Sequence, residues 1–314
     1  MIINTGMRTD VPAFYAEWFA NRLREGYVCT RNPYCPNRVT KYSLSPEVVD
    51  LIVFCTKNPA PMLEHRKLLE PYGQYWFVTI TPYGRETEPN VPAVEKVMED
   101  FRRLSGMVGA DGMAWRYDPI MVTETYTVER HLAEFERMAE GLAGATHTCV
   151  ISFIDLYGKV RRNFPQAREV SQPDRIALGK EMIRIAKEHD MIVRTCAEGD
   201  GLAKYGADCG GCMTQAVFEK ALGCRLNVPK EKSPRPECGC LMGKDIGQYD
   251  TCGHLCKYCY ANSNAEAVRR NRMQHDPRSP LLIGKLREED VVREARQASW
   301  RDGQVRLFDV DGFS

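Results

Sequence analysis

Three cysteines near the end of the chain have the spacing of a metal-binding loop. The stretch TCGHLCKYCYAN, residues 251–262, places Cys252, Cys256 and Cys259 in a CxxxCxxC pattern. A cubane iron–sulfur cluster takes four cysteine ligands, so a loop with three thiols leaves one iron open to a group that is not protein. The spacing therefore predicts a 4Fe-4S cluster whose open iron binds a small molecule.

Two other interpretations of this loop stay open. Structural zinc sites take four ligands, usually from paired positions, and His254 or a distant cysteine could complete such a site. A disulfide framework is typical of secreted chains, and nothing in this sequence indicates secretion.

Composition indicates an ordinary globular protein. The chain has 314 residues, of which 43% are apolar and 27% are charged, and its formal net charge is +1. This charge gives no hint of a polyanionic partner. The first residues lack a basic segment followed by an apolar one, and no apolar run approaches the roughly twenty residues of a membrane span. We therefore expect a cytoplasmic protein without membrane contact, in which several of the 13 cysteines are metal ligands.

Short apolar runs alternate with amphipathic helical stretches. The predicted strands are residues 2–4, 51–55, 75–80, 113–117, 148–154 and 191–195. Helices are predicted between them, with starts at Asp10, Ser45–Pro46, Pro92, Thr127 and Pro173 and an end of the first helix at Gly26. Six β-then-α units predict the α/β class, as a partial (β/α)6-type parallel barrel.

Polar residues follow the ends of these strands, where the chemistry of parallel barrels is located. We predict Lys57, Arg116 and Asp118 as catalytic residues. Because side chains alternate along a strand, Arg116 and Asp118 should share the inward face. The predicted cofactor-binding residues at the strand ends are Arg8, Asp10, Thr56, Asn58 and Ser152.

The CxxxCxxC loop, with Tyr258 before its last cysteine, resembles the cluster loop of the radical S-adenosylmethionine (SAM) superfamily. The resemblance implies that the open iron chelates SAM and that one electron releases a deoxyadenosyl radical. It also implies that Tyr258 packs near the adenine of SAM. An electron donor such as flavodoxin or ferredoxin is implied as well.

The runs VFCTKNP, FVTITPYG and WRYDPI resemble consecutive strand ends of the spore photoproduct lyase branch. In that branch the cysteine loop precedes these strands, so this chain looks circularly permuted. From MRTD to YCYAN it is similar to an uncharacterised bacterial family, domain of unknown function 1848. The GGE turn of many radical SAM enzymes is absent, and TKN stands in its place.

A second cysteine-rich segment follows the sixth predicted strand. Resemblance to the family implies an auxiliary iron–sulfur cluster held by Cys196, Cys212, Cys238 and Cys240. Zinc suits four cysteines equally well, and Cys209 and Cys224 are alternative ligands. The remaining cysteines are interpreted as buried or incidental thiols: Cys29, Cys35, Cys55 and Cys149.

We predict four segments: a barrel at 1–200, the auxiliary metal segment at 201–250, the cluster loop at 251–262 and a helical tail at 263–314. The permuted order requires the stretch CLMGKDIGQYD, residues 240–250, to run beside the first strand. The leading hypothesis is a radical SAM enzyme with an unknown substrate. The alternatives are a non-catalytic iron–sulfur or zinc module, such as an electron carrier, and a nucleic-acid repair lyase by analogy. The linear sequence has no basic stripe with interleaved aromatics, so a nucleic-acid partner is not expected.

Overall fold

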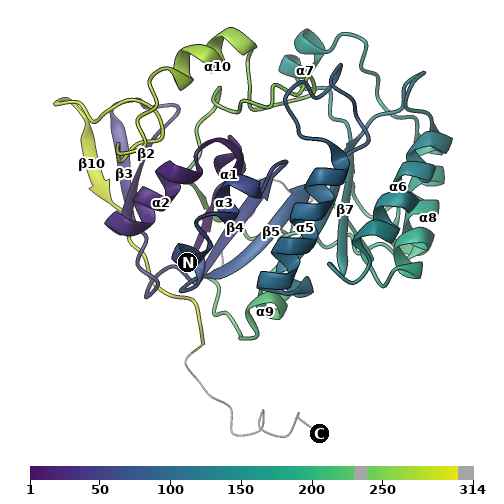
Figure 1. The fold of residues 1–314 in the computed structure, drawn as a ribbon, viewed down its shortest axis with the longest axis horizontal. Coiled ribbons are helices and arrows are strands. Elements are labelled where there is room, and N and C mark those ends of the chain that lie inside the picture. Colours follow the sequence, from purple (N-terminus) through teal and green to yellow (C-terminus); the bar gives the residue numbers. More distant parts are fainter. Residues whose placement is uncertain (230–238, 303–314) are drawn as a thin grey trace, which may run out of the picture.

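A seven-stranded parallel sheet forms the centre of the computed structural model, which describes residues 1–229 and 239–302 (Figure 1). The strand order is β8-β7-β6-β5-β4-β1-β9. The strands are β1 (Ile2–Asn4), β4 (Leu51–Thr56), β5 (Gly73–Thr79), β6 (Met113–Ile120), β7 (Thr148–Phe153), β8 (Ile192–Thr195) and β9 (Lys244–Asp245). All six predicted strands are present, and the α/β class is confirmed. Within the described residues the sheet stays open, with β8 and β9 as its edges.

Strand β9 belongs to the stretch, residues 240–250, that was expected to run beside the first strand. Ile3 pairs with Lys244 and Asn4 with Asp245, both in parallel register. The approach is close, because a Cβ added at Gly243 would lie 3.0 Å from the Ile2 carbonyl oxygen. The prediction for residues 240–250 is confirmed.

The helices begin and end largely where capping residues predict. The Asp10 carboxylate accepts a hydrogen bond from Ala13 N at 2.9 Å, and Thr127 accepts one from Arg130 N at 3.2 Å. Gly26 ends its helix with φ +75°, where a side chain would be strained. The helices are α1 (Val11–Phe14), α2 (Ala16–Glu25), α3 (Ala60–Leu63), α4 (Arg66–Leu69), α5 (Val94–Val108), α6 (Val128–Leu142), α7 (Gly158–Asn163), α8 (Gln172–Glu188), α9 (Gln215–Leu222) and α10 (Ala265–Arg272), with 3-10 turns Ala110–Gly112 and Ala203–Tyr205. No helix among the described residues has the length and apolar character to cross a bilayer.

The two faces of the sheet have different partners. Trp76 and Trp115 point to the side covered by α5 and α6, where Trp115 stacks on Phe135 with ring centroids 4.7 Å apart. The opposite side, here called the inner face, carries Tyr75 and is packed by Phe218 of α9, with centroids 5.5 Å apart. The alternation of side chains along each strand thus divides two apolar cores.

A second sheet was not predicted. Strands β2 (Tyr27–Arg31) and β3 (Arg38–Ser43) form an antiparallel hairpin, and β10 (Val291–Glu294) joins β3 in parallel. The hairpin was missed because its strands are mostly polar and half-exposed. The third strand, which pairs with β3, comes from more than 250 residues further along the chain.

Two helix predictions were wrong. At Ser45 the chain makes a single turn, in which Val48 N and Val49 N donate to the Ser45 carbonyl, and then enters β4. The predicted helical tail is helical only in α10 within its described part, because Pro277 and Pro280 interrupt it and the β-branched pair Val291–Val292 favours a strand.

Candidate metal and cofactor site

The CxxxCxxC loop, residues 251–262, lies across the carboxyl ends of β1 and β5. The Tyr15 hydroxyl donates to the Thr251 carbonyl at 2.8 Å, and Lys257 N donates to the Thr87 carbonyl at 3.0 Å. The Tyr260 hydroxyl donates to the Met7 carbonyl. Tyr15, Thr87 and Met7 all come after the ends of these strands. The loop therefore sits on the side of the sheet that the sequence predicted.

The loop holds its three thiols half-buried. Leu255, between the first two cysteines, adopts φ +58°, and Ala261 N donates to Cys259 Sγ at 3.3 Å. Burial raises the pKa of Cys252 well above its ordinary value, and the neighbouring charges of Asp10, Cys259 and Cys256 raise it further. The three thiols therefore lie close enough to influence one another.

Burial also raises the pKa of Cys256 to about 12, although the Lys57 charge opposes this. The raised pKa favours the protonated thiol. A bound metal ion would favour the thiolate instead, because a thiol that coordinates a metal is deprotonated. Among residues 1–229 and 239–302, no group of three or more His, Cys, Asp or Glu side chains is arranged to hold a metal ion. The donor set suits an iron–sulfur cluster by its chemistry, because the loop supplies three cysteine thiols and one of them, Cys259 Sγ, accepts a backbone N–H bond.

A hydrogen-bonded group of charged side chains lies beside Cys256. Lys57 Nζ donates to Glu88 Oε1 at 2.9 Å and to Thr81 Oγ1 at 3.3 Å, and the Tyr258 hydroxyl donates to the same Glu88 oxygen. Burial would lower the pKa of Lys57, but the charges of Glu88 and Cys256 outweigh it and the pKa is raised. Lys57 is therefore a fixed cation next to the thiol loop.

Asp10 joins three parts of the site. Its Oδ1 caps α1, and its Oδ2 accepts hydrogen bonds from Lys57 N and from His254 Nε2, both at 2.8 Å. The Asp10 carboxylate therefore fixes the turn after β4 against the thiol loop, and its hydrogen bonds position these two segments.

Arg116 and Asp118 lie on the inner face, as side-chain alternation predicts. Trp115 and Tyr117 pack on the helix side, whereas the Arg116 guanidinium lies 5.4 Å from the centroid of the Phe77 ring on the inner face. Arg116 Nε donates to Asp118 Oδ2 at 2.9 Å, and Ser152 donates to Asp118 Oδ1. The pair and its hydroxyl partner form one polar group.

A family model described as Domain of unknown function (DUF1848) matches residues 2–261. The chain belongs to this family. The matched span begins in β1 and ends two residues beyond Cys259, so it includes both the sheet and the thiol loop. No curated protein and no solved structure matches the chain.

A second group of thiols in this DUF1848 chain lies at the inner face. Cys212 Sγ and Cys240 Sγ are 3.8 Å apart, and Met213 N donates to Cys240 Sγ at 3.3 Å. A hydrogen bond from Cys212 and the charge of Arg116 lower the pKa of Cys196 to about 7, although burial opposes them. Cys196, Cys212 and Cys240 thus lie close together at the inner face, and their role as metal ligands stays a prediction. The fourth predicted ligand, Cys238, lies outside the described residues.

Three further cysteines of the DUF1848 chain lie in the apolar packing on the two faces of the sheet. Cys209 packs on the helix-side core, away from Cys212. Cys149 is fully buried there, as expected. Cys55 faces inward, and a Cβ at Gly6 would lie 2.3 Å from the Cys55 Cβ, so this contact requires glycine.

Three predicted cofactor-binding residues make local contacts. Thr56 Oγ1 accepts from Asn58 N at 2.9 Å, and Asn58 Oδ1 accepts from Ala60 N at 3.3 Å, so both shape the turn after β4. Arg8 forms an ion pair with Asp245 and ties the loop after β1 to β9. Cofactor binding by these three side chains stays a prediction.

Buried polar atoms around the loop lack partners within the described residues. They are Asn262 Oδ1, Thr9 Oγ1 and Asn4 Nδ2, all on residues no more than 5% exposed. Such atoms are costly unless something hydrogen-bonds to them. Their positions, at and after the end of β1 and at the end of the thiol loop, fit a site that binds a polar cofactor.

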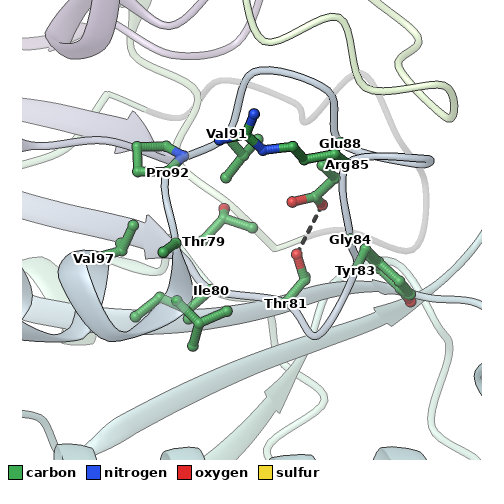
Figure 2. A pocket seen from close by; sticks show the side chains of 12 residues that line it. Thr79, Ile80, Thr81, Tyr83, Gly84, Arg85, Glu88, Val91, Pro92 and Val97 are labelled. Atoms are coloured by element: carbon green, nitrogen blue, oxygen red, sulfur yellow. Dashed lines mark hydrogen bonds between the residues drawn. The ribbon is translucent and has the colours of Figure 1, made fainter.

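Glu88 was missed by the sequence analysis. It sits in the irregular segment GRETEPN after β5, where no pattern marks one carboxylate among several. A pocket of about 170 Å³ lies on its other side, between Glu88, Arg85 and the start of α5. Figure 2 shows Glu88 hydrogen-bonded to Thr81 at the edge of this pocket. Glu88 therefore separates a solvent pocket from the thiol loop.

Proposed function

We propose that this protein is a radical SAM enzyme in which Cys252, Cys256 and Cys259 hold a 4Fe-4S cluster. The observation that supports this most is that the CxxxCxxC loop lies over the strand ends beside Lys57, Glu88 and Tyr258. When bound, the cluster would supply the electron for reductive cleavage of SAM.

The side chains of this chain would do the remaining work. Glu88 and Thr81 hold the Lys57 side chain in place through hydrogen bonds. Its ammonium group could therefore orient the carboxylate of SAM at little further cost in side-chain entropy. The Tyr258 ring is fixed by its bond to Glu88 and offers a flat face for the adenine of SAM. Arg116, Asp118 and Ser152 offer donors and acceptors to a polar substrate at the inner face.

We further propose that Cys196, Cys212 and Cys240 take part in a second metal centre, an auxiliary iron–sulfur cluster. Zinc is the alternative, because a tetrahedral site with Zn–S bonds of about 2.3 Å has sulfur atoms about 3.8 Å apart. The Cys212–Cys240 separation is 3.8 Å. Metal analysis decides between the two.

A non-catalytic metal module or electron carrier is the second candidate function. Such a module has no use for the Arg116–Asp118–Ser152 group on the inner face, and this group favours the enzyme. The repair-lyase alternative rests on analogy of fold and sequence runs.

Anaerobic purification followed by iron and sulfide counts, with assay of deoxyadenosine release from SAM after reduction, tests the proposal. Replacing Cys252, Cys256 and Cys259 together by Ala should remove one cubane's worth of iron and all SAM cleavage. Replacing Cys35, a half-buried thiol of the β2–β3 loop, is the control and should change neither. SAM cleavage by the triple variant would refute the assignment.

A further inference from the structure

The surface around the thiol loop collects side chains from three separated parts of the chain. Helices α7 and α10 flank the loop, and Asn163 Nδ2 of α7 donates to the Ser263 carbonyl just before α10 at 3.2 Å. Figure 1 shows α7 and α10 on the same side of the molecule. We call this surface, formed by residues 155–162, 249–260 and 266–272, the loop face.

Positive charge dominates the loop face. Its cations are Lys159, Arg161, Arg162, Lys257, Arg269, Arg270 and Arg272, and its carboxylates are Asp155, Asp250 and Glu266, with Glu169 adjoining. Arg161 pairs with Glu169 at 3.7 Å and Arg270 with Glu266 at 3.4 Å. In the described part of the chain Arg162 and Arg269 are exposed and have no carboxylate within 4.0 Å. This concentration of charge contrasts with the net +1 of the chain.

Exposed aromatic rings lie among these cations. Tyr157 is 43% exposed and Tyr260 is 48% exposed, and their ring centroids are 6.4 Å apart. Lys159 Nζ lies 5.3 Å from the centroid of the Tyr249 ring, and Tyr260 directly follows Cys259 in the chain. Flat rings and cations therefore meet next to the last cysteine of the loop.

We propose that the loop face binds single-stranded nucleic acid, with phosphates on Arg162 and Arg269 and a base on Tyr157 and Tyr260. Arginine is suited to phosphate by its planar set of donors, and bases stack on exposed aromatic rings with little dependence on sequence. An acidic protein partner would use the charges but has no need of the paired rings. The basic and aromatic pattern is absent from the linear sequence because its members come from three distant segments.

The role of the loop face as a substrate site rests on the proposed function. A nucleotide held on Tyr157 and Tyr260 would lie beside Cys259, because Tyr260 is the next residue of the thiol loop. The substrate class would then be a nucleotide within a single strand. Binding itself requires neither the cluster nor SAM.

Fluorescence anisotropy with labelled single-stranded DNA and RNA of about 16 nucleotides tests the proposal on the full-length protein. At physiological salt we expect dissociation constants of roughly 10⁻⁴ to 10⁻⁶ M, which weaken steeply between about 50 and 200 mM salt. Arg162→Ala and Arg269→Ala should each reduce the salt slope by about 0.7. Tyr157→Ala should weaken binding about 5- to 150-fold with an unchanged slope, and Tyr157→Phe should bind like the parent.

Arg103→Ala on α5 is the matched control, since Arg103 is an exposed arginine outside the loop face. Equal binding by the Arg162 and Arg103 variants would overturn the proposal. The proposal would also be overturned if the protein bound flavodoxin but no oligonucleotide, and if the Arg162 and Arg269 variants lost this flavodoxin binding. Thermal melting of every variant checks that each is folded.

The two proposals fail separately. Deoxyadenosine release by a protein that binds no oligonucleotide would sink the nucleic-acid surface and leave the radical SAM assignment intact. Loop-face-dependent oligonucleotide binding by a protein that holds iron but never cleaves SAM would support the surface and sink the assignment.

Discussion

His254 Nε2 lies 2.8 Å from Asp10 Oδ2, although 244 positions separate the two residues in the sequence. Both side chains are buried, with exposed fractions of 3% and 7%. His254 Nδ1 faces the Asn90 carbonyl at 3.2 Å, so both ring nitrogens meet oxygen acceptors. The ring thus anchors the CxxxCxxC loop to the first strand end and to the segment after β5.

Replacing His254 by Ala should lower the free energy of unfolding by about 2 kcal/mol, because it removes one of the three hydrogen bonds that the buried Asp10 carboxylate accepts. Urea unfolding measures this change. His254→Gln keeps one donor toward Asp10 and should recover part of the loss. We also expect lower iron content in the Ala variant. Parent-like stability and iron content would show that the loop is held by its other contacts.

Replacing Arg116 or Asp118 by Ala should weaken binding of SAM or substrate roughly tenfold, which is about 1.4 kcal/mol, since each variant breaks the polar group on the inner face. Iron content and fold should be retained. Isothermal titration with SAM, with Arg103→Ala as control, measures the effect. If kinetics are unchanged while solubility falls, the pair has a structural role instead.

Cys212→Ala should remove metal other than that of the CxxxCxxC loop, because Cys212 lies at the centre of the second thiol group. Cys224→Ala is the comparison, since Cys224 follows α9 and is not among the thiols that act on Cys212. Elemental analysis for iron and zinc reports both ligand choice and metal identity. Equal metal loss in the two variants would contradict this ligand set.

The Arg31–Asp290 pair should make the three-stranded sheet sensitive to acid. The hydrogen bond from Arg31 lowers the pKa of Asp290 from 3.8 to about 2. Because the carboxyl pKa is lower in the folded state than in the unfolded state, the ionised Asp290 stabilises the fold at any pH above its ordinary pKa. This stabilisation is lost as the pH falls from about 4 through about 2. Amide exchange in β3 should therefore differ between the parent and Asp290→Asn at pH 6 and converge toward pH 2. A constant difference across this range would exclude the mechanism.

Local chemistry let the sequence predict most of the central fold. The apolar runs identified six strands of the seven-stranded sheet, and Asp10, Thr127 and Gly26 marked helix ends, because capping depends on residues only a few positions apart. Alternation along β6 separated Arg116 from Trp115 for the same reason. The β2–β3–β10 sheet was missed because its strands are polar and its third member comes from the end of the chain.

The sequence by itself determined the CxxxCxxC spacing and, because the thiol loop follows the strands in the chain, the expectation that β9 lies beside β1. Only the tertiary structure decided that Glu88 would join Lys57 to Tyr258, because these residues come from three segments with no shared pattern. It also decided the loop face, where tyrosines and arginines from distant helices meet around one loop. The spacing of residues within a loop is set by the local sequence. The surroundings of a charged side chain are set by long-range contacts, which form only when distant segments fold against one another.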